Sequence, residues 1–164
     1  MAFDPTKLHM GPAEVTWGGT HLGYTLNDSV KVSMSTETTP VTPDQTSLPV
    51  MDVVTSTTVT VEATFAQIED ILSILPGASE SGLKDAGGMD LKNFAKELVL
   101  KPYDVDPEDD IKATGFEYTF PKACPIVTDG FSFAKTTPQG ITLSFKVYAD
   151  DGGQFMTWKN TTTA

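Results

Sequence analysis

The sequence predicts a mainly β protein: an antiparallel two-sheet β-sandwich or barrel with one flanking α-helix. Three observations predict this class. Several segments alternate apolar and polar residues with a period of two, Gly and Pro turn signals separate these segments, and one segment carries an apolar stripe at helical spacing. A period of two places successive side chains on opposite faces of a strand, as a half-buried sheet requires.

The clearest strand ends where the predicted helix begins. Val59, Val61, Ala63 and Phe65 fall on one face, and the residues between them are Thr or Glu. The Thr and Val content suits a pleated surface. Residues 30–35 alternate in the same way and form a second strand candidate.

A closing β-hairpin is predicted near the end of the chain. Apolar residues occupy every second position of residues 141–148, and Pro138-Gln139-Gly140 would turn this strand back toward Phe131 and Phe133. Among the shorter strand candidates, residues 14–17 and 22–26 form a predicted hairpin that turns at Gly18-Gly19. Two further short strands are predicted at residues 97–103 and 116–120.

The helix is predicted from apolar residues at spacings of three and four. These residues are Phe65, Ile68, Ile71, Leu72 and Leu75. Thr64 with Gln67 has the form of a capping box, and Pro76-Gly77 ends the pattern. Residues 91–98 predict a loop or one helical turn that leads into a strand.

The 164 residues predict a single domain, residues 1–164, with three segments outside its core. These are an N-terminal arm (1–12), a long loop (36–52) and a C-terminal arm (150–164). The long loop carries three prolines and exceeds the usual length of a hairpin connection. The Gly- and Ser-rich residues 77–90 have no clear place in this arrangement.

Composition excludes several classes of function. The formal charge of -11 and the pI near 4.4 argue against a surface that grips nucleic acid, because such affinity comes from Lys and Arg. The single cysteine, Cys124, fits a reducing compartment and a buried packing role. With neither a signal-like nor a membrane-spanning segment, we expect a protein made in the cytosol and no membrane partner.

The sequence carries no recognisable catalytic, cofactor or metal motif. His9 and His21 lack the companions of a zinc site or catalytic triad, and the Gly pairs are not phosphate loops. The acidic run 104–110 fails as a calcium loop, because Asp109 stands where Gly is needed and Gly115 where Glu is needed. We therefore expect no enzyme activity, no cofactor and no bound metal.

The order of these elements carries a family resemblance over about residues 11–150. It consists of the early hairpin at Gly18-Gly19, the long loop with Asp44, Gln45 and Pro49, and the Thr/Val strand running into a short helix. Residues 97–102, 120–125 and the closing hairpin to residue 150 follow in order. In this succession the chain resembles the major tail-tube proteins of long-tailed, siphovirus-like bacteriophages.

The resemblance implies a structural protein of the virion tail, assembled in the host cytoplasm. It implies hexameric rings that stack into a tube through which double-stranded DNA passes without being bound. It also implies contact with other tail proteins, namely the tape measure, tail terminator and distal tail proteins. Contacts between rings would come from the long loop and the terminal arms.

Two sets of site residues follow. The inter-ring contact loop would use residues at the tip of the long loop: Val41, Asp44, Gln45, Leu48, Pro49, Val50 and Met51. Its prolines restrict the free conformations and so lower the cost of ordering on docking. Candidate lumen acids that repel DNA are Glu37, Asp52 and Glu62. The alternatives are a surface loop without a role and acids that merely face solvent.

Two other functions stay open at this point. Trp17, Trp158 and the four tyrosines could supply a sugar-binding platform, so a carbohydrate-binding β-sandwich or virion adhesin is the rival from another class. A tube protein of the type VI secretion kind would keep the fold and change the assembly. A glycosidase reading lacks any sign that two carboxylates stand at the required separation.

Overall fold

The computed structural model describes residues 13–26, 29–79, 81–102 and 116–160. The side chains of Pro102 and Asn160 are not described. The predicted N-terminal arm 1–12, with His9, and the acidic run 104–110 lie outside the described residues.

The protein is mainly β, as predicted, and the eight strands found in the described residues form one antiparallel sheet. The strand order is β2-β1-β5-β6-β7-β4-β3, and β8 also pairs with β6. The bounds are β1 Ala13–Trp17, β2 Thr20–His21, β3 Lys31–Val41, β4 Met51–Phe65, β5 Lys96–Pro102, β6 Phe116–Asp129, β7 Ile141–Tyr148 and β8 Thr157–Asn160. The prediction of two separate sheets is corrected, because hydrogen bonds connect all the strands.

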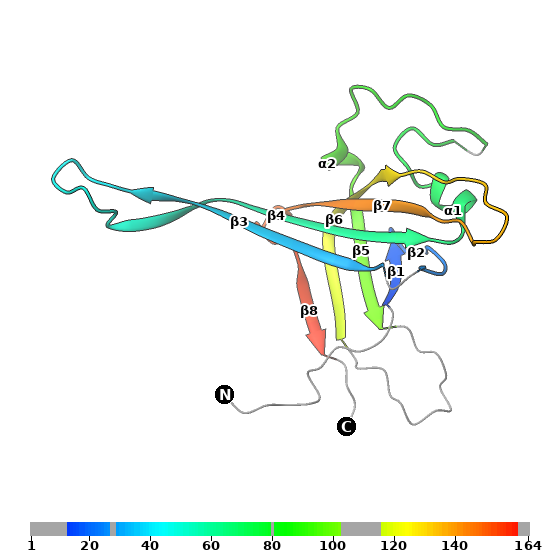
Figure 1. Ribbon diagram of the computed structural model, residues 1–164, viewed down its shortest axis with the longest axis horizontal. Helices are drawn as coiled ribbons and strands as arrows, with labels where there is room; N and C mark the ends of the chain where they lie inside the picture. Colours follow the sequence, from blue (N-terminus) through cyan, green and yellow to red (C-terminus); the bar gives the residue numbers. More distant parts are fainter. Residues whose placement is uncertain (1–12, 27–28, 80, 103–115, 161–164) are drawn as a thin grey trace.

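Strand β6 joins two crossing halves of this sheet. The first residues of β6 pair with β5 on one side and β8 on the other; Tyr118, for example, pairs with both Leu100 and Trp158. From Lys122 onward, β6 pairs with β7. In Figure 1, β5, β8 and the first part of β6 run across the direction of β3, β4 and β7. The fold is thus a sandwich-like arrangement made from one continuous sheet.

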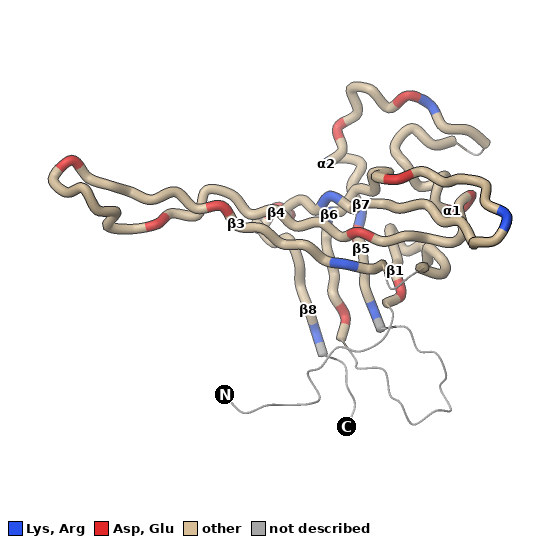
Figure 2. The backbone as a smooth tube through the Cα atoms, viewed as in Figure 1, with Lys and Arg blue, Asp and Glu red and all other residues tan. Residues whose placement is uncertain are grey.

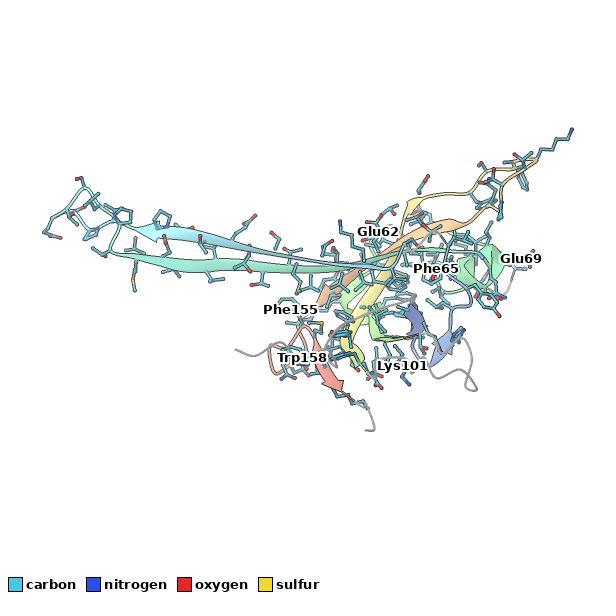
Figure 3. All side chains as sticks on the ribbon, turned by 60° about the horizontal axis from the view of Figure 1, so that its bottom comes forward. Glu62, Phe65, Glu69, Lys101, Phe155 and Trp158 are labelled. Atoms are coloured by element: carbon cyan, nitrogen blue, oxygen red, sulfur yellow. The ribbon has the colours of Figure 1, made fainter. Side chains whose placement is uncertain are left out.

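The core lies between these halves and uses the predicted alternation. All four apolar residues of the β4 pattern are buried, as are those of β7. The β7 residues are Ile141, Leu143, Phe145 and Val147. The rings of Phe65 and Phe145 meet edge to face at 6.4 Å. Figure 3 shows side chains crowded around Phe65, whereas those along the outer β3–β4 hairpin project into open space.

The early hairpin turns at Gly18-Gly19 as predicted, with Trp17 opposite Thr20. Both glycines have positive φ, 58° and 82°, which is the backbone that a two-residue hairpin turn of this kind requires. The predicted position of the second strand, 22–26, was wrong, because β2 spans Thr20–His21 and within 22–26 only Thr25 forms a bridge, to Phe65. Leu22 is nevertheless buried in the core.

The predicted helix begins later than expected. Helix α1 spans Ile68–Leu72, and Phe65 belongs to β4. The capping box was wrong, because Gln67 is the N-cap residue and makes no side-chain cap hydrogen bond. The Thr64 hydroxyl instead pairs with the Thr142 hydroxyl at 2.9 Å, a bond across β4 and β7 that local sequence could not reveal.

A second short helix, α2, spans Leu91–Phe94 and is followed by β5, in agreement with the predicted helical turn and strand. The Asp90 carboxylate caps it by accepting a hydrogen bond from the backbone N–H of Lys92 at 3.0 Å. The unplaced segment 77–90 connects α1 to α2, and within it Ala78 and Leu83 form an isolated bridge.

Two predictions about segments near the C-terminus are corrected. Phe131 and Phe133 lie in the loop between β6 and β7, because the partner of β7 is the long strand β6. The predicted C-terminal arm contains β8, which pairs with β6 over Thr157–Asn160. Phe155 and Met156 pack against the core, so this segment is anchored by apolar burial as well as by the ladder.

Candidate functional site

The segment predicted as a long loop forms a β-hairpin that projects from the domain (Figure 1). We call residues 33–58 the arm. Its strand parts are the outer portions of β3 and β4, so residues 36–41 and 51–52 are strand, correcting the loop prediction. Only residues 42–50 form a connecting loop. At 3.2 to 3.4 Å per residue, the eight residues of β4 from 51 to 58 extend about 25 Å.

The arm has almost no interior of its own. Every residue from 33 to 58 is exposed except Pro43, which is half-buried. An isolated two-stranded hairpin is at best marginally stable in water. The arm is therefore a structure whose side chains are available for contact with another surface.

A β-bulge changes which side chains share a face of the arm. The pairing shifts between Glu37 and Thr38, where Ser56 pairs with Glu37 and Val54 pairs with Thr38, so Thr55 has no cross-strand partner. An extra residue in one strand shifts the alternation of that strand by one position, so each side chain beyond the bulge points to the face opposite to the one that regular alternation would give it. Nearer the domain, odd-numbered residues of β4 face the core side.

Beyond the bulge, Met51 and Val53 lie on the outward face, opposite to the face of Val59. They pair there with Val41 and Thr39 of β3. Val54 turns to the core-side face, the face of Met34. Without the bulge, Met51 and Val53 would share a face with the core residues of β4.

The predicted contact residues come together at the tip of the arm. Val41 and Met51 are cross-strand partners, and the Val50 N–H donates a hydrogen bond to the Val41 carbonyl oxygen at 3.0 Å. Asp44 and Gln45 form the turn at the extreme tip, and Leu48 and Pro49 follow in the loop. All seven predicted contact residues are exposed.

We define the tip patch as the large apolar side chains at this end of the arm: Val41, Leu48, Val50, Met51 and Val53. Their exposed fractions run from 41% for Val41 to 70% for Leu48. A cluster of exposed apolar side chains marks an interaction surface more strongly than single exposed residues do. Val53 was missed by the sequence prediction, although the adjacent pair Val53-Val54 interrupts the alternation and so signals a bulge.

The three candidate lumen acids do not share one face. Glu37 and Glu62 are on the outward face, and Asp52 pairs with Pro40 on the other face beyond the bulge. The Glu37 carboxylate accepts a hydrogen bond from the Ser56 hydroxyl at 3.1 Å. Glu62 stands opposite Lys31, and Lys146 of β7 stands opposite neighbouring Thr60, so the outward face near Glu62 carries both signs of charge.

Charge along the arm itself is of one sign. Residues 33–58 contain Glu37, Asp44 and Asp52 and no Lys or Arg. Figure 2 shows these positions as red segments on a projection that has no blue one. The apolar tip patch is therefore accompanied on the arm by negatively charged side chains only.

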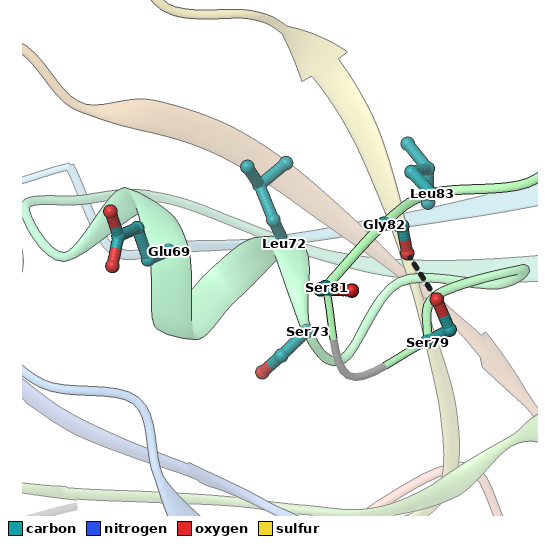
Figure 4. A pocket seen from close by; sticks show the side chains of 7 residues that line it. All are labelled: Glu69, Leu72, Ser73, Ser79, Ser81, Gly82 and Leu83. Atoms are coloured by element: carbon teal, nitrogen blue, oxygen red, sulfur yellow. Dashed lines mark hydrogen bonds between the residues drawn. The ribbon is translucent and has the colours of Figure 1, made fainter.

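One hollow lies elsewhere, between α1 and the following segment, with a volume of about 350 Å³. Its described lining comprises Glu69, Leu72, Ser73, Ser79, Ser81, Gly82 and Leu83 (Figure 4). The Ser79 hydroxyl donates to the Gly82 carbonyl oxygen at 3.1 Å, which fixes the loop. These lining residues offer one carboxylate and three hydroxyls without a histidine or lysine to activate a nucleophile.

His21 and Cys124 have structural surroundings. His21 Nε2 lies 3.1 Å from a Glu14 carboxylate oxygen, and its Nδ1 accepts a hydrogen bond from the Gly23 N–H. Cys124 is fully buried, and this burial raises the pKa of its thiol to about 11. A thiol of this kind stays protonated near neutral pH and is a poor nucleophile.

Among residues 13–26, 29–79, 81–102 and 116–160, no group of three or more His, Cys, Asp or Glu side chains is placed to hold a metal ion. In that same part of the chain, no helix has the length and apolar character needed to cross a membrane. Compared with known families and curated proteins, the sequence matches no family model and no individual protein.

Proposed function

We propose that this chain is a structural subunit that assembles with copies of itself into stacked rings, forming a tube of the phage-tail kind that conducts double-stranded DNA. The observation that carries this proposal is the arm with its exposed tip patch. A soluble monomer gains nothing from holding five large apolar side chains in water on a projecting hairpin, whereas a subunit that buries them on a neighbour does.

The edge of the sheet supports the same proposal. Strand β3 ends the strand order, so within the part of the chain that the structure describes no strand pairs with its outer side, which can pair with another chain. Pro40 interrupts that edge only near the tip, which leaves Val32 to Thr39 without a proline. Proteins that remain monomeric usually protect a long edge strand with lysine, proline or a covering element.

The charge distribution fits a conduit that does not retain DNA. The chain has twice as many acidic as basic residues, and the three charged residues of the arm, Glu37, Asp44 and Asp52, are all acidic. DNA carries about one negative charge per 1.7 Å, so a wall with many copies of the same carboxylates repels it. Asp52 is the strongest candidate for that wall, because Glu62 has Lys31 opposite to it and Glu37 shares the face of Met51 and Val53, whereas Asp52 lies on the other face of the arm.

The location and partners follow from this proposal. The subunit would reside in the tail of a virion after assembly in the host cytoplasm. Its principal partner would be itself, and the ends of the tube would meet the tape measure, terminator and distal tail proteins. The contact residues would be those of the tip, from Val41 to Met51.

Only one of the two tryptophans considered for the rival sugar-binding function is accessible to a ligand. Trp17 is 3% exposed, and its ring nitrogen is occupied by a hydrogen bond to the Ala123 carbonyl oxygen. Trp158 is exposed, but a platform built on it lacks the second indole. A type VI secretion tube remains a related assembly that would use the same arm.

The decisive experiment deletes the arm between two cross-strand partners that a short turn can connect. Ser35 and Thr58 are cross-strand partners, so residues 36–57 can be replaced by Asn-Gly, which favours a two-residue hairpin turn. Negative-stain electron microscopy and light scattering at rising concentration should show rings and tubes for the intact protein. The shortened protein should melt cooperatively and form no tubes. An intact protein that stays monomeric at every concentration, even with virion extract, would refute the proposal.

A further inference from the structure

A second exposed apolar feature lies at the opposite end of the molecule from the arm. The loop between β6 and β7, residues 130–140, occupies the end of the long axis away from the arm tip (Figure 1). We define the loop patch as Phe131 and Phe133, which are 45% and 97% exposed. Their rings meet edge to face with centroids 6.1 Å apart.

The loop is held so that these rings point away from the core. The Ser132 hydroxyl donates to the Gln139 side-chain oxygen at 2.8 Å, and the Gln139 side-chain nitrogen donates to the Thr137 carbonyl oxygen at 3.3 Å. These bonds brace one side of the loop against the other. Exposing almost a whole phenylalanine ring to water is unfavourable relative to burying it.

The two ends are complementary in charge as well as in apolar character. All charged residues of the arm are acidic, whereas the single charged residue of the loop is the basic Lys135. Asp129 precedes the loop at the end of β6. Figure 2 shows a blue segment at the loop end and red segments along the arm.

This charge pattern discriminates between modes of self-contact. A two-fold contact of arm with arm would bring Glu37, Asp44 and Asp52 of both copies together, and a contact of loop with loop would bring two copies of Lys135 together. Like charges in an interface disfavour both arrangements. A contact of arm with loop joins opposite charges, and a head-to-tail contact of that kind repeats without limit unless it closes.

We propose that the tip patch of one copy docks on the loop patch of a second copy. Phe131 and Phe133 pack against the outward face of the arm at Val41, Met51 and Val53, and Lys135 faces Glu37, the carboxylate of that same face. This inference rests on the proposed self-assembly and names the surface that receives the arm. The bulge at Thr55 is what presents Met51 and Val53 on the docking face.

The first test uses two variants that block opposite ends of the contact. Phe133→Asp blocks the loop, and Met51→Asp combined with Val53→Asp blocks the arm; all three residues are exposed, so the fold should survive. Each variant alone should form no tubes at about ten times the concentration at which the unmodified protein assembles. Met34→Asp combined with Val54→Asp is the matched control on the other face of the arm, and it should assemble normally.

Mixing the two blocked variants gives the sharper result. The intact arm of the loop variant can dock on the intact loop of the arm variant, and the remaining ends are both blocked. Sedimentation should therefore show the mass of the starting species doubling once and then stopping. Failure of the mixture to associate would show that arm and loop contact different surfaces, which overturns this inference.

Cross-linking supplies a test that does not depend on lost assembly. A Met51→Cys protein mixed with a Phe133→Cys protein should give a disulfide-linked pair under mild oxidation, and neither should do so alone; buried Cys124 stays silent. Normal tubes from Phe133→Asp would overturn the arm-to-loop contact and leave the proposed function standing. Unmodified protein that never assembles, together with the lack of a mixed disulfide, would overturn both.

Discussion

The ring nitrogen of Trp17 donates a hydrogen bond of 2.8 Å to the carbonyl oxygen of Ala123 inside the protein. Trp17 is on β1 and Ala123 is on β6, so the bond ties the outer part of one half of the sheet to the strand that both halves share. The Lys96 ammonium lies 5.0 Å from the Trp17 ring centroid, and Phe94 packs against the same ring. Trp17 is thus a structural anchor.

Trp17→Phe should lower the free energy of unfolding by about 2 kcal/mol, because the buried Ala123 carbonyl loses this donor and the smaller ring leaves a void. Urea unfolding followed by circular dichroism measures the change. Trp158→Phe is the matched control on an exposed site and should change stability by less than about 0.5 kcal/mol. Equal effects of the two substitutions would contradict the anchoring role.

Gly140→Ala should destabilise the protein by about 1 to 3 kcal/mol through overpacking. A Cβ at this position would lie 2.7 Å from the Phe65 carbonyl oxygen and 2.8 Å from Leu26 Cδ1, where β7 begins against the end of β4. Gly130→Ala, at the other end of the same loop, meets no atom within 4 Å and serves as the control. Thermal melting should separate the two variants clearly.

The Cys124 thiol should resist modification by a thiol-reactive disulfide reagent in the native protein and react at once in urea. Burial favours its neutral form, and the pKa of about 11 leaves little thiolate below pH 9. Rapid modification of the folded protein near neutral pH would show that the site opens.

The same raised pKa predicts a pH dependence of stability. A folded thiol that holds its proton more tightly than the unfolded one stabilises the fold fully below about pH 9, and this contribution is lost as pH rises toward 11. The unfolding free energy of the unmodified protein should therefore fall more steeply over that interval than that of Cys124→Ala. Parallel curves would mean that the thiol does not contribute.

Insertion of one threonine between Glu37 and Thr38 should abolish tube formation and leave the fold intact. The inserted residue would pair with Thr55 and remove the bulge, which would turn Met51 and Val53 to the core-side face of the arm, while the buried residues from Val59 to Phe65 keep their pairing with β7. Electron microscopy reports assembly, and a melting curve reports folding. Tubes as abundant as those of the intact protein would show that the facing of the tip does not matter.

The alternating residues of β4 and β7 could be assigned from sequence because each strand buries one face, and burial imposes a period of two. The early hairpin was equally readable, since Gly18 and Gly19 supply the positive φ that its turn needs. The start of α1 was predicted too early, because Phe65 fits both the two-residue period of the strand and the spacing of three and four residues of the helix. Its place in β4 is decided by pairing with Ile141, which is far away in the sequence.

The sequence by itself determined the mainly β class and the alternating core residues of β4 and β7. Only the tertiary structure decided that residues 33–58 form a projecting hairpin, that the bulge turns Met51 and Val53 outward, and that the loop between β6 and β7 lies at the opposite end from the arm. The reason is physical: periodicity records which side chains of one strand share a face, whereas strand partners, bulges and distances between ends depend on pairing between distant segments.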